Sequence, residues 1–126
     1  MKKLVLALFL GLIGIVASAQ DTAGPVITFE EKTYEFGDIH QGDVVEHTFK
    51  FSNTGDTPLV ITNVTTTCGC TAPKWPKEPI QPGDSGEILV KFNSRGKRGV
   101  QNKPITVYSN AKSTTKISIT TNVLVE

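Results

Sequence analysis

Two cysteines separated by one glycine, Cys68-Gly69-Cys70, are the residues with the most chemical potential in this chain of 126 residues. They are the only cysteines in the sequence. Side chains two positions apart on an extended strand lie on the same face, so both sulfurs can meet one partner. Three kinds of chemistry fit this spacing: a structural disulfide, a thiol-exchange site, or a site for a soft metal ion such as copper(I) or zinc.

None of the three interpretations is excluded by the residues alone. A disulfide that closes a loop of about three residues contributes roughly 1.6 kcal/mol of loop entropy, and strain in the small ring opposes that gain. A strained, exposed disulfide is in turn easier to exchange. A metal ion would need a further ligand, and His40 and His47 are the only imidazoles. The cysteine pair is therefore a candidate disulfide and a candidate metal site at once.

A proline-rich stretch follows the cysteines, with prolines at positions 73, 76, 79 and 82. This density excludes a helix or a central strand, so residues 72–82 are expected to form an extended loop. Trp75 lies in this stretch with Lys74 and Lys77 beside it. Rigid prolines lower the entropy lost on docking, and tryptophan is enriched in binding hot spots. Trp75, Lys74 and Lys77 are the candidate partner-binding residues, although a tryptophan can equally fold back to close the end of a sandwich.

The sequence predicts no catalytic residues. It contains no paired acid and base, no phosphate-binding loop and no nucleophile with a plausible base beside it. His47 is in phase with Phe49 and Phe51, which favours a partly buried structural histidine over an acid–base or metal-binding one. We therefore expect a protein that is not an enzyme and has no cofactor, apart from the copper or zinc that the cysteines could hold.

The first 19 residues are typical of a secretory signal peptide, with Lys2 and Lys3, an apolar run at residues 4–16 and the small residues Ala17-Ser18-Ala19. The apolar run is too short for a comfortable membrane span. Its removal leaves 107 residues and changes the net charge from +1 to about −1. A net charge this close to zero does not favour binding to nucleic acid or to an anionic membrane. We expect a secreted or periplasmic protein whose mature form has no membrane span.

The remaining residues are rich in β-branched side chains, with 16 threonines, 10 valines and 8 isoleucines against 3 leucines and 3 alanines. Such side chains pack well on a pleated sheet, so the mature chain is expected to be all-β. Alternation and turn residues predict about seven strands, and residues 26–29 and 32–36 form a first extended pair that ends at Gly37. The others are residues 44–51, 59–67, 87–92, 104–109 and 115–125. An immunoglobulin-like antiparallel β-sandwich is the expected fold, with a closed barrel as the alternative.

The expected organisation is a signal peptide at residues 1–19, a loose segment at residues 20–27 and one sandwich domain at residues 28–126. In residues 44–51 the face that carries Val45, His47, Phe49 and Phe51 is expected to be buried. Ile88, Val90 and Phe92 are expected to face inward, as are the alternate residues from Ile117 to Val125.

Several short motifs in this domain resemble those of a bacterial secreted family of unknown function, the domain-of-unknown-function 1573 family. The matching strings are Phe36-Gly37-Asp38-Ile39, Gly42, residues 47–55, Cys68-Gly69-Cys70-Thr71, Trp75-Pro76 and Ile80-Gln81-Pro82-Gly83. The resemblance covers residues 28–125. It implies an immunoglobulin-like fold related to the domains of Hydin and abnormal-spindle proteins, and a secreted location. It implies no particular activity.

Taken together, these features predict a non-enzymatic binding or structural module. Its partner would be a protein or glycan in the cell envelope or outside, contacted through the sheet edges and residues 68–82. The alternative is a small periplasmic metal-binding or thiol-exchange protein that uses Cys68 and Cys70.

Overall fold

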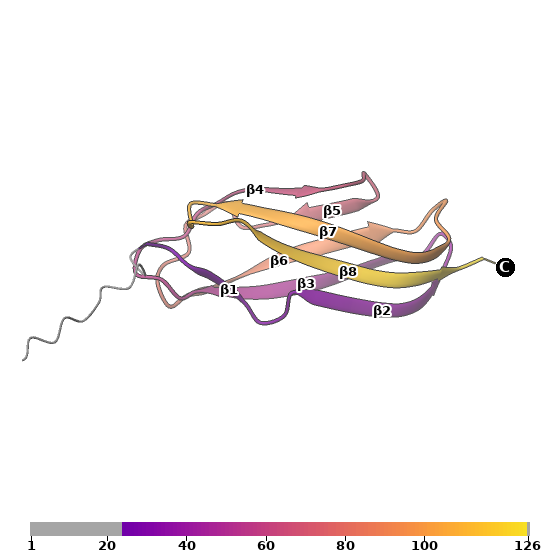
Figure 1. Cartoon of the computed structure of the whole chain (residues 1–126), viewed down its shortest axis with the longest axis horizontal. Coiled ribbons are helices and arrows are strands. Elements are labelled where there is room, and N and C mark those ends of the chain that lie inside the picture. The colour runs from indigo at the N-terminus through magenta and orange to yellow at the C-terminus, as the bar shows by residue number, and fades with distance from the viewer. Residues whose placement is uncertain (1–23, 126) are drawn as a thin grey trace, which may run out of the picture.

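The computed structural model describes residues 24–125, which form eight β-strands in two stacked sheets (Figure 1). No helix occurs in this range, and so none that could cross a membrane. The expected signal peptide, residues 1–19, lies outside the described residues, as do residues 20–23 of the segment expected to be loose. The all-β sandwich confirms the fold class that the β-branched composition predicted.

Each sheet contains four of these strands. The first has the order β1 (Ile27–Phe29), β3 (Val44–Asn53), β6 (Ser85–Asn93) and β5 (Thr71–Lys74). The second has the order β2 (Thr33–His40), β8 (Thr115–Leu124), β7 (Gly99–Ser109) and β4 (Ile61–Thr66). Neighbouring strands are antiparallel except β2 and β8, which run parallel. The sandwich is thus mixed at one position, where the sequence predicted antiparallel pairing throughout.

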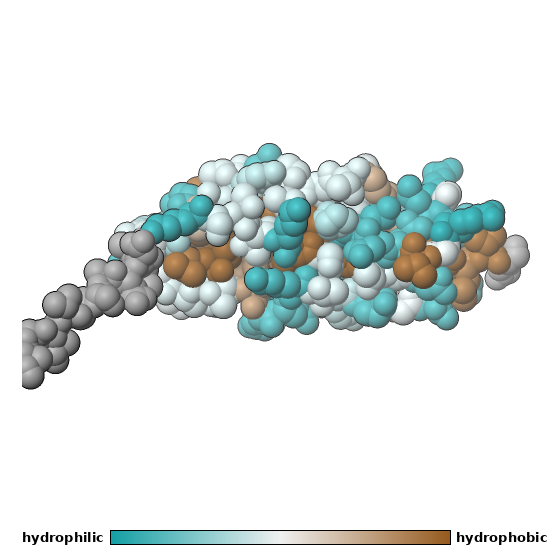
Figure 2. Space-filling view, in the orientation of Figure 1, coloured by the Kyte–Doolittle hydropathy of each residue, from teal (hydrophilic) through white to brown (hydrophobic). Residues whose placement is uncertain are grey.

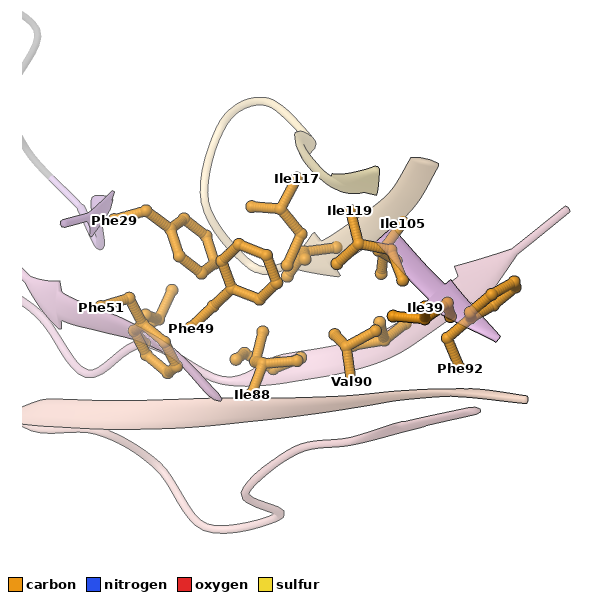
Figure 3. Close-up of a cluster of buried hydrophobic side chains, with 14 of the residues drawn as sticks. Phe29, Ile39, Phe49, Phe51, Ile88, Val90, Phe92, Ile105, Ile117 and Ile119 are labelled. Atoms are coloured by element: carbon orange, nitrogen blue, oxygen red, sulfur yellow. The ribbon is translucent and has the colours of Figure 1, made fainter. Parts of the chain in front are cut away.

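Alternation along the strands builds the core between the sheets. On β3, Phe49 and Phe51 are fully buried while Lys50 between them is exposed. The neighbouring strand in the same sheet, β6, buries Ile88, Val90 and Phe92 in the same way, as expected. Figure 3 shows these side chains converging with Ile105, Ile117 and Ile119 from the other sheet. Burial of apolar surface at roughly 25 cal/mol per Å² is the main force that holds the two sheets together.

A glycine on β6 makes room for one of the core aromatics. Gly86 lies directly opposite Phe51, and a Cβ built on Gly86 would lie 2.6 Å from Phe51 Cζ. We expect Gly86→Ala to lower the free energy of unfolding by about 1–3 kcal/mol, because the fully buried ring must shift. Urea unfolding measures this change. Gly69→Ala is the matched control, since no heavy atom outside residues 68–70 lies within 4 Å of a Cβ there. Equal effects at the two glycines would contradict the packing explanation.

Several details of the strands differ from the sequence-based prediction. β1 and β2 do not pair, because β1 bonds to β3 and β2 bonds to β8 in the other sheet. β2 does not end at Gly37 but continues to His40, and a register shift between Glu35 and Asp38 absorbs the irregularity. Val125 was expected to be buried, yet it follows the end of β8 and is 45% exposed.

The proline-rich stretch is also more ordered than predicted. Residues 72–82 were expected to form a loop, but Ala72, Pro73 and Lys74 belong to strand β5. β5 pairs with β6 on one side only and lies at the edge of its sheet. Proline is tolerated at an edge because its missing N–H can face away from the ladder. A short strand at the edge of the sheet therefore accommodates Pro73 and still forms hydrogen bonds with β6.

Asn53 is a fully buried polar residue at the end of β3, where several loops meet. Its Oδ1 accepts hydrogen bonds from the backbone N–H groups of Val26 (3.3 Å) and Gly55 (2.9 Å). Its Nδ2 donates to the carbonyl oxygens of Thr57 (2.8 Å) and Ile80 (2.9 Å). One amide side chain thereby ties the start of β1 and the loop before β6 to the turn that follows β3.

Candidate functional site

The two cysteines lie at the corner where the chain crosses from β4 in one sheet to β5 in the other. Cys68 and Cys70 are joined by a disulfide, with their Cα atoms 5.3 Å apart. Both residues are half-buried, and Cys70 packs against the edge of the hydrophobic core. The disulfide therefore sits at an accessible end of the sandwich and joins no distant segments.

The structure gives the metal interpretation no further ligand. Within residues 24–125, no group of three or more histidine, cysteine or acidic side chains is placed to hold a metal ion. His40, one of the two candidate imidazoles, lies at the end of β2, and its backbone N–H donates to Asp43 Oδ2 at 2.9 Å. His47, the other, is engaged elsewhere. The described residues bring neither imidazole into a cluster with the cysteines.

His47 bridges the two sheets through ring contacts. Its imidazole stacks on Tyr34 of β2, with ring centroids 3.6 Å apart and planes inclined by 10°. It meets Phe49 edge-on at 4.8 Å. Its Nε2 hydrogen-bonds to the carboxylate of Glu31. The side chain is 20% exposed, as a partly buried structural histidine would be. The two ring contacts hold the imidazole in place, and its Nε2 is already bonded to Glu31.

A shallow groove of about 780 Å³ lies on the outer face of the first sheet. Its size falls within the range of about 300–1,000 Å³ that is common for ligand sites. Side chains from β3, β5 and β6, together with residues just beyond β1 and β5, form its lining. The lining residues are Glu30, Lys50, Lys74, Trp75, Pro76, Ser85, Gly86, Glu87 and Leu89.

Trp75 forms one wall of this groove and also packs against the core. The residue is half-buried, so it packs against the core and still contributes to the surface of the groove. Lys77 Nζ lies 3.5 Å from the centroid of the indole ring, a cation–π contact. Lys74 lines the groove, and Lys77 covers the ring from outside. The structure thus brings together the three candidate partner-binding residues.

Four charged side chains in the groove balance each other: Lys50, Lys74, Glu30 and Glu87. All four are exposed, and none of them forms an ion pair or a side-chain hydrogen bond with another described residue. Outside the groove on the same face, Lys91 and Glu46 do pair, at 3.9 Å. The groove therefore carries hydrogen-bonding groups of both signs that are available to a ligand, and no net charge.

Most of the groove was not predicted from the sequence. Lys50, Glu87 and Leu89 lie on the outward faces of β3 and β6, which the alternation of the strands does indicate. Their proximity to Trp75 depends on the register, which places Lys50 opposite Glu87 and Lys74 opposite Leu89. No sequence pattern in a single chain specifies that β5 pairs with β6.

The face of the molecule in Figure 2 is mostly hydrophilic or neutral, and its apolar atoms form separate small patches. Two packed four-stranded sheets with the core between them define an immunoglobulin-like β-sandwich domain. The chain belongs to the family described as protein of unknown function DUF1573, whose family model matches residues 27–123. The resemblance to this family is thereby confirmed. A search of curated proteins finds no match.

Solved structures agree with this fold. A protein of unknown function from Porphyromonas gingivalis W83 superposes with a TM-score of 0.70 at 16% identity, covering 83% of this chain and 50% of that one. The ASH/PapD-like domain 7 of human CEP192 gives a TM-score of 0.65 at 10% identity and covers 95% and 99%. The secreted serine protease VesC from Vibrio cholerae gives 0.60 at 13% identity, over 78% and 23%. This chain spans only half of the Porphyromonas protein and about a quarter of VesC. At these identities the likeness concerns the fold alone.

Proposed function

We propose that this domain is a non-enzymatic binding module that holds a neutral glycan segment in the groove beside Trp75. The observation that carries the proposal is the groove itself, because it combines an aromatic wall with four uncommitted charged side chains. Such a lining offers donors and acceptors to hydroxyl groups without selecting for a charged ligand. The signal-like residues 1–19 support action after export, in the periplasm or outside the cell.

The chemistry of the lining favours hydroxyl groups over a strongly charged partner. Lys50 and Lys74 donate hydrogen bonds, Glu30 and Glu87 accept them, and their charges cancel. An anionic polymer would be repelled by the two carboxylates as much as it is attracted by the two lysines, so it would gain little binding energy. Pro76 and Leu89 add apolar surface to the lining beside Trp75, and this surface suits the C–H groups of a sugar ring.

The fluorescence of Trp75 provides a direct test, since it is the only tryptophan in the chain. We expect neutral polysaccharides, represented by mannan and arabinogalactan, to include one that changes this emission in a saturable way. Lys50→Ala and Glu87→Gln should each weaken that binding by about fivefold to tenfold, because each removes a hydrogen bond that involves a charged group. Lys91→Ala, on the same face outside the groove, is the matched control and should leave the affinity unchanged.

Alginate and a panel of extended peptides serve as the competing probes in the same titration. Saturable binding of a peptide with no response to any neutral polysaccharide would contradict the glycan proposal. If Lys50→Ala and Lys91→Ala weakened binding equally, the ligand would not lie in the groove.

A further inference from the structure

We propose that the Cys68–Cys70 disulfide is a thiol-exchange site that accepts the thiolate of a dithiol peptide at Cys68 Sγ. The site lies at the corner between β4 and β5 and uses no residue of the groove. It is therefore independent of the glycan-binding proposal.

The corner keeps its shape through hydrogen bonds that do not involve the sulfur–sulfur bond. The Thr66 hydroxyl donates to the carbonyl oxygens of Cys68 (3.1 Å) and Thr71 (3.3 Å). The backbone N–H of Thr71 donates to the Cys68 carbonyl at 3.3 Å, and that of Asn93 donates to the Cys70 carbonyl at 2.9 Å. Because the disulfide joins residues only two positions apart, it adds little to a turn that is already anchored at both ends.

The glycine between the cysteines places no side chain beside the disulfide. Gly69 is exposed, and no heavy atom outside residues 68–70 lies within 4 Å of the place where its Cβ would be. Its φ angle is not among the positive ones, so the backbone does not require glycine there. Neither a positive φ angle nor contact with a distant residue therefore requires glycine at this position. A larger side chain at residue 69 would add bulk next to both cysteines, while the hydrogen bonds of the corner would remain.

The two sulfurs have different surroundings, which assigns them different roles. The backbone N–H of Cys70 donates to Cys68 Sγ at 3.3 Å, a contact that stabilises a thiolate on Cys68. Cys70 packs against the core, and its Sγ lies 3.8 Å from the Thr71 hydroxyl. Cys68 is therefore the sulfur that forms the mixed disulfide, and Cys70 is the sulfur that leaves when the peptide thiolate attacks.

The exchange balances with a dithiol peptide as the only co-reactant. The first peptide thiolate attacks Cys68 Sγ, the Cys68–Cys70 bond breaks, and Cys70 leaves as a thiolate beside the Thr71 hydroxyl. The second peptide thiolate attacks the peptide sulfur of the mixed disulfide, and Cys68 leaves as a thiolate beside the Cys70 N–H. The peptide dithiol is oxidised to a disulfide, the protein disulfide is reduced to two thiols, and the two protons pass to the cysteines.

The rate of reduction tests the access argument. The oxidised full chain is mixed with dithiothreitol as the dithiol probe, quenched with an alkylating agent and analysed by intact mass. We expect Gly69→Leu to slow reduction by about tenfold or more relative to Gly69→Ala, because attack requires an open line to the sulfur. Both variants should unfold at the wild-type temperature. Equal rates for Gly69→Leu and Gly69→Ala would overturn the proposal.

Single-cysteine variants test the assignment of roles. With oxidised glutathione, the free Cys68 of Cys70→Ser should form a mixed disulfide about tenfold faster than the free Cys70 of Cys68→Ser. A faster or equal reaction at Cys70 would overturn the assignment. The reduced and alkylated wild-type chain should keep the unfolding temperature of the oxidised chain, measured by circular dichroism. A large drop would show that the disulfide is a structural bond, and so would also contradict the proposal.

Discussion

Replacing Asn53 with aspartate is expected to lower the free energy of unfolding by about 3–5 kcal/mol, although the two side chains have almost the same shape. The oxygen that accepts from Val26 and Gly55 is kept. The Nδ2 donor is replaced by a second oxygen, which then faces the carbonyl oxygens of Thr57 and Ile80. Because residue 53 is fully buried, no solvent reaches these groups to compensate for the loss.

Urea unfolding at neutral pH measures the effect, with Asn110→Asp as the control. Asn110 makes similar bonds, since its Oδ1 accepts from the Val60 N–H (2.9 Å) and its Nδ2 donates to the Pro58 carbonyl (3.1 Å). It is exposed, however, and water can replace the lost donor. The control should lose about 1 kcal/mol or less. A loss at residue 53 no larger than that at residue 110 would mean that burial does not govern the role of Asn53.

Phe49→Ala is expected to destabilise the domain by a similar amount, about 3–5 kcal/mol. The ring is fully buried between the sheets (Figure 3). It also meets the His47 ring edge-on. Its removal leaves a cavity that the neighbouring side chains of two hydrogen-bonded sheets fill only in part.

Val100→Ala is the control, because Val100 is an apolar residue on β7 that is 79% exposed. It should change the free energy of unfolding by about 0.5 kcal/mol or less. If Phe49→Ala cost less than about 1.5 kcal/mol, the core at this point would be looser than the structure shows.

The sequence predicted the parts of the fold that depend on local pattern. Alternation placed Phe49 and Phe51 on the buried face of their strand, and it placed Ile88, Val90 and Phe92 on the buried face of theirs. These predictions succeeded because a one-residue shift would turn the whole apolar set toward solvent. The same rule failed at Val125, where the strand ends before the alternation does.

The features that depend on pairing between distant strands were not predictable from one chain. Parallel pairing of β2 with β8, and the edge position of β5, follow from which strands meet rather than from the composition of either strand. Asparagine favours turns in any sequence, so an asparagine at the end of a strand does not indicate a buried role. Only the tertiary arrangement brings Thr57 and Ile80 within reach of its amide.

The candidate site divides in the same way. The cysteine pair, Trp75 and its two lysines stood out because of residue type and spacing alone. The charged residues of the groove did not, since exposed lysine and glutamate are ordinary on the outer face of a sheet. What separates Lys50 and Glu87 from Lys91 and Glu46 is the missing ion pair, which a sequence does not reveal.

The central place of β8 in its sheet has a consequence for how the domain is made. β8 is the last strand in the sequence, yet it separates β2 from β7, and its pairing with β2 joins Thr33 to Ser118. Until residues 115–124 have left the ribosome, β2 has no strand to bond to and the second sheet stays incomplete. The two-sheet core of the nascent domain can therefore close only after almost all of these residues have been synthesised, and until then the first sheet exposes its apolar face.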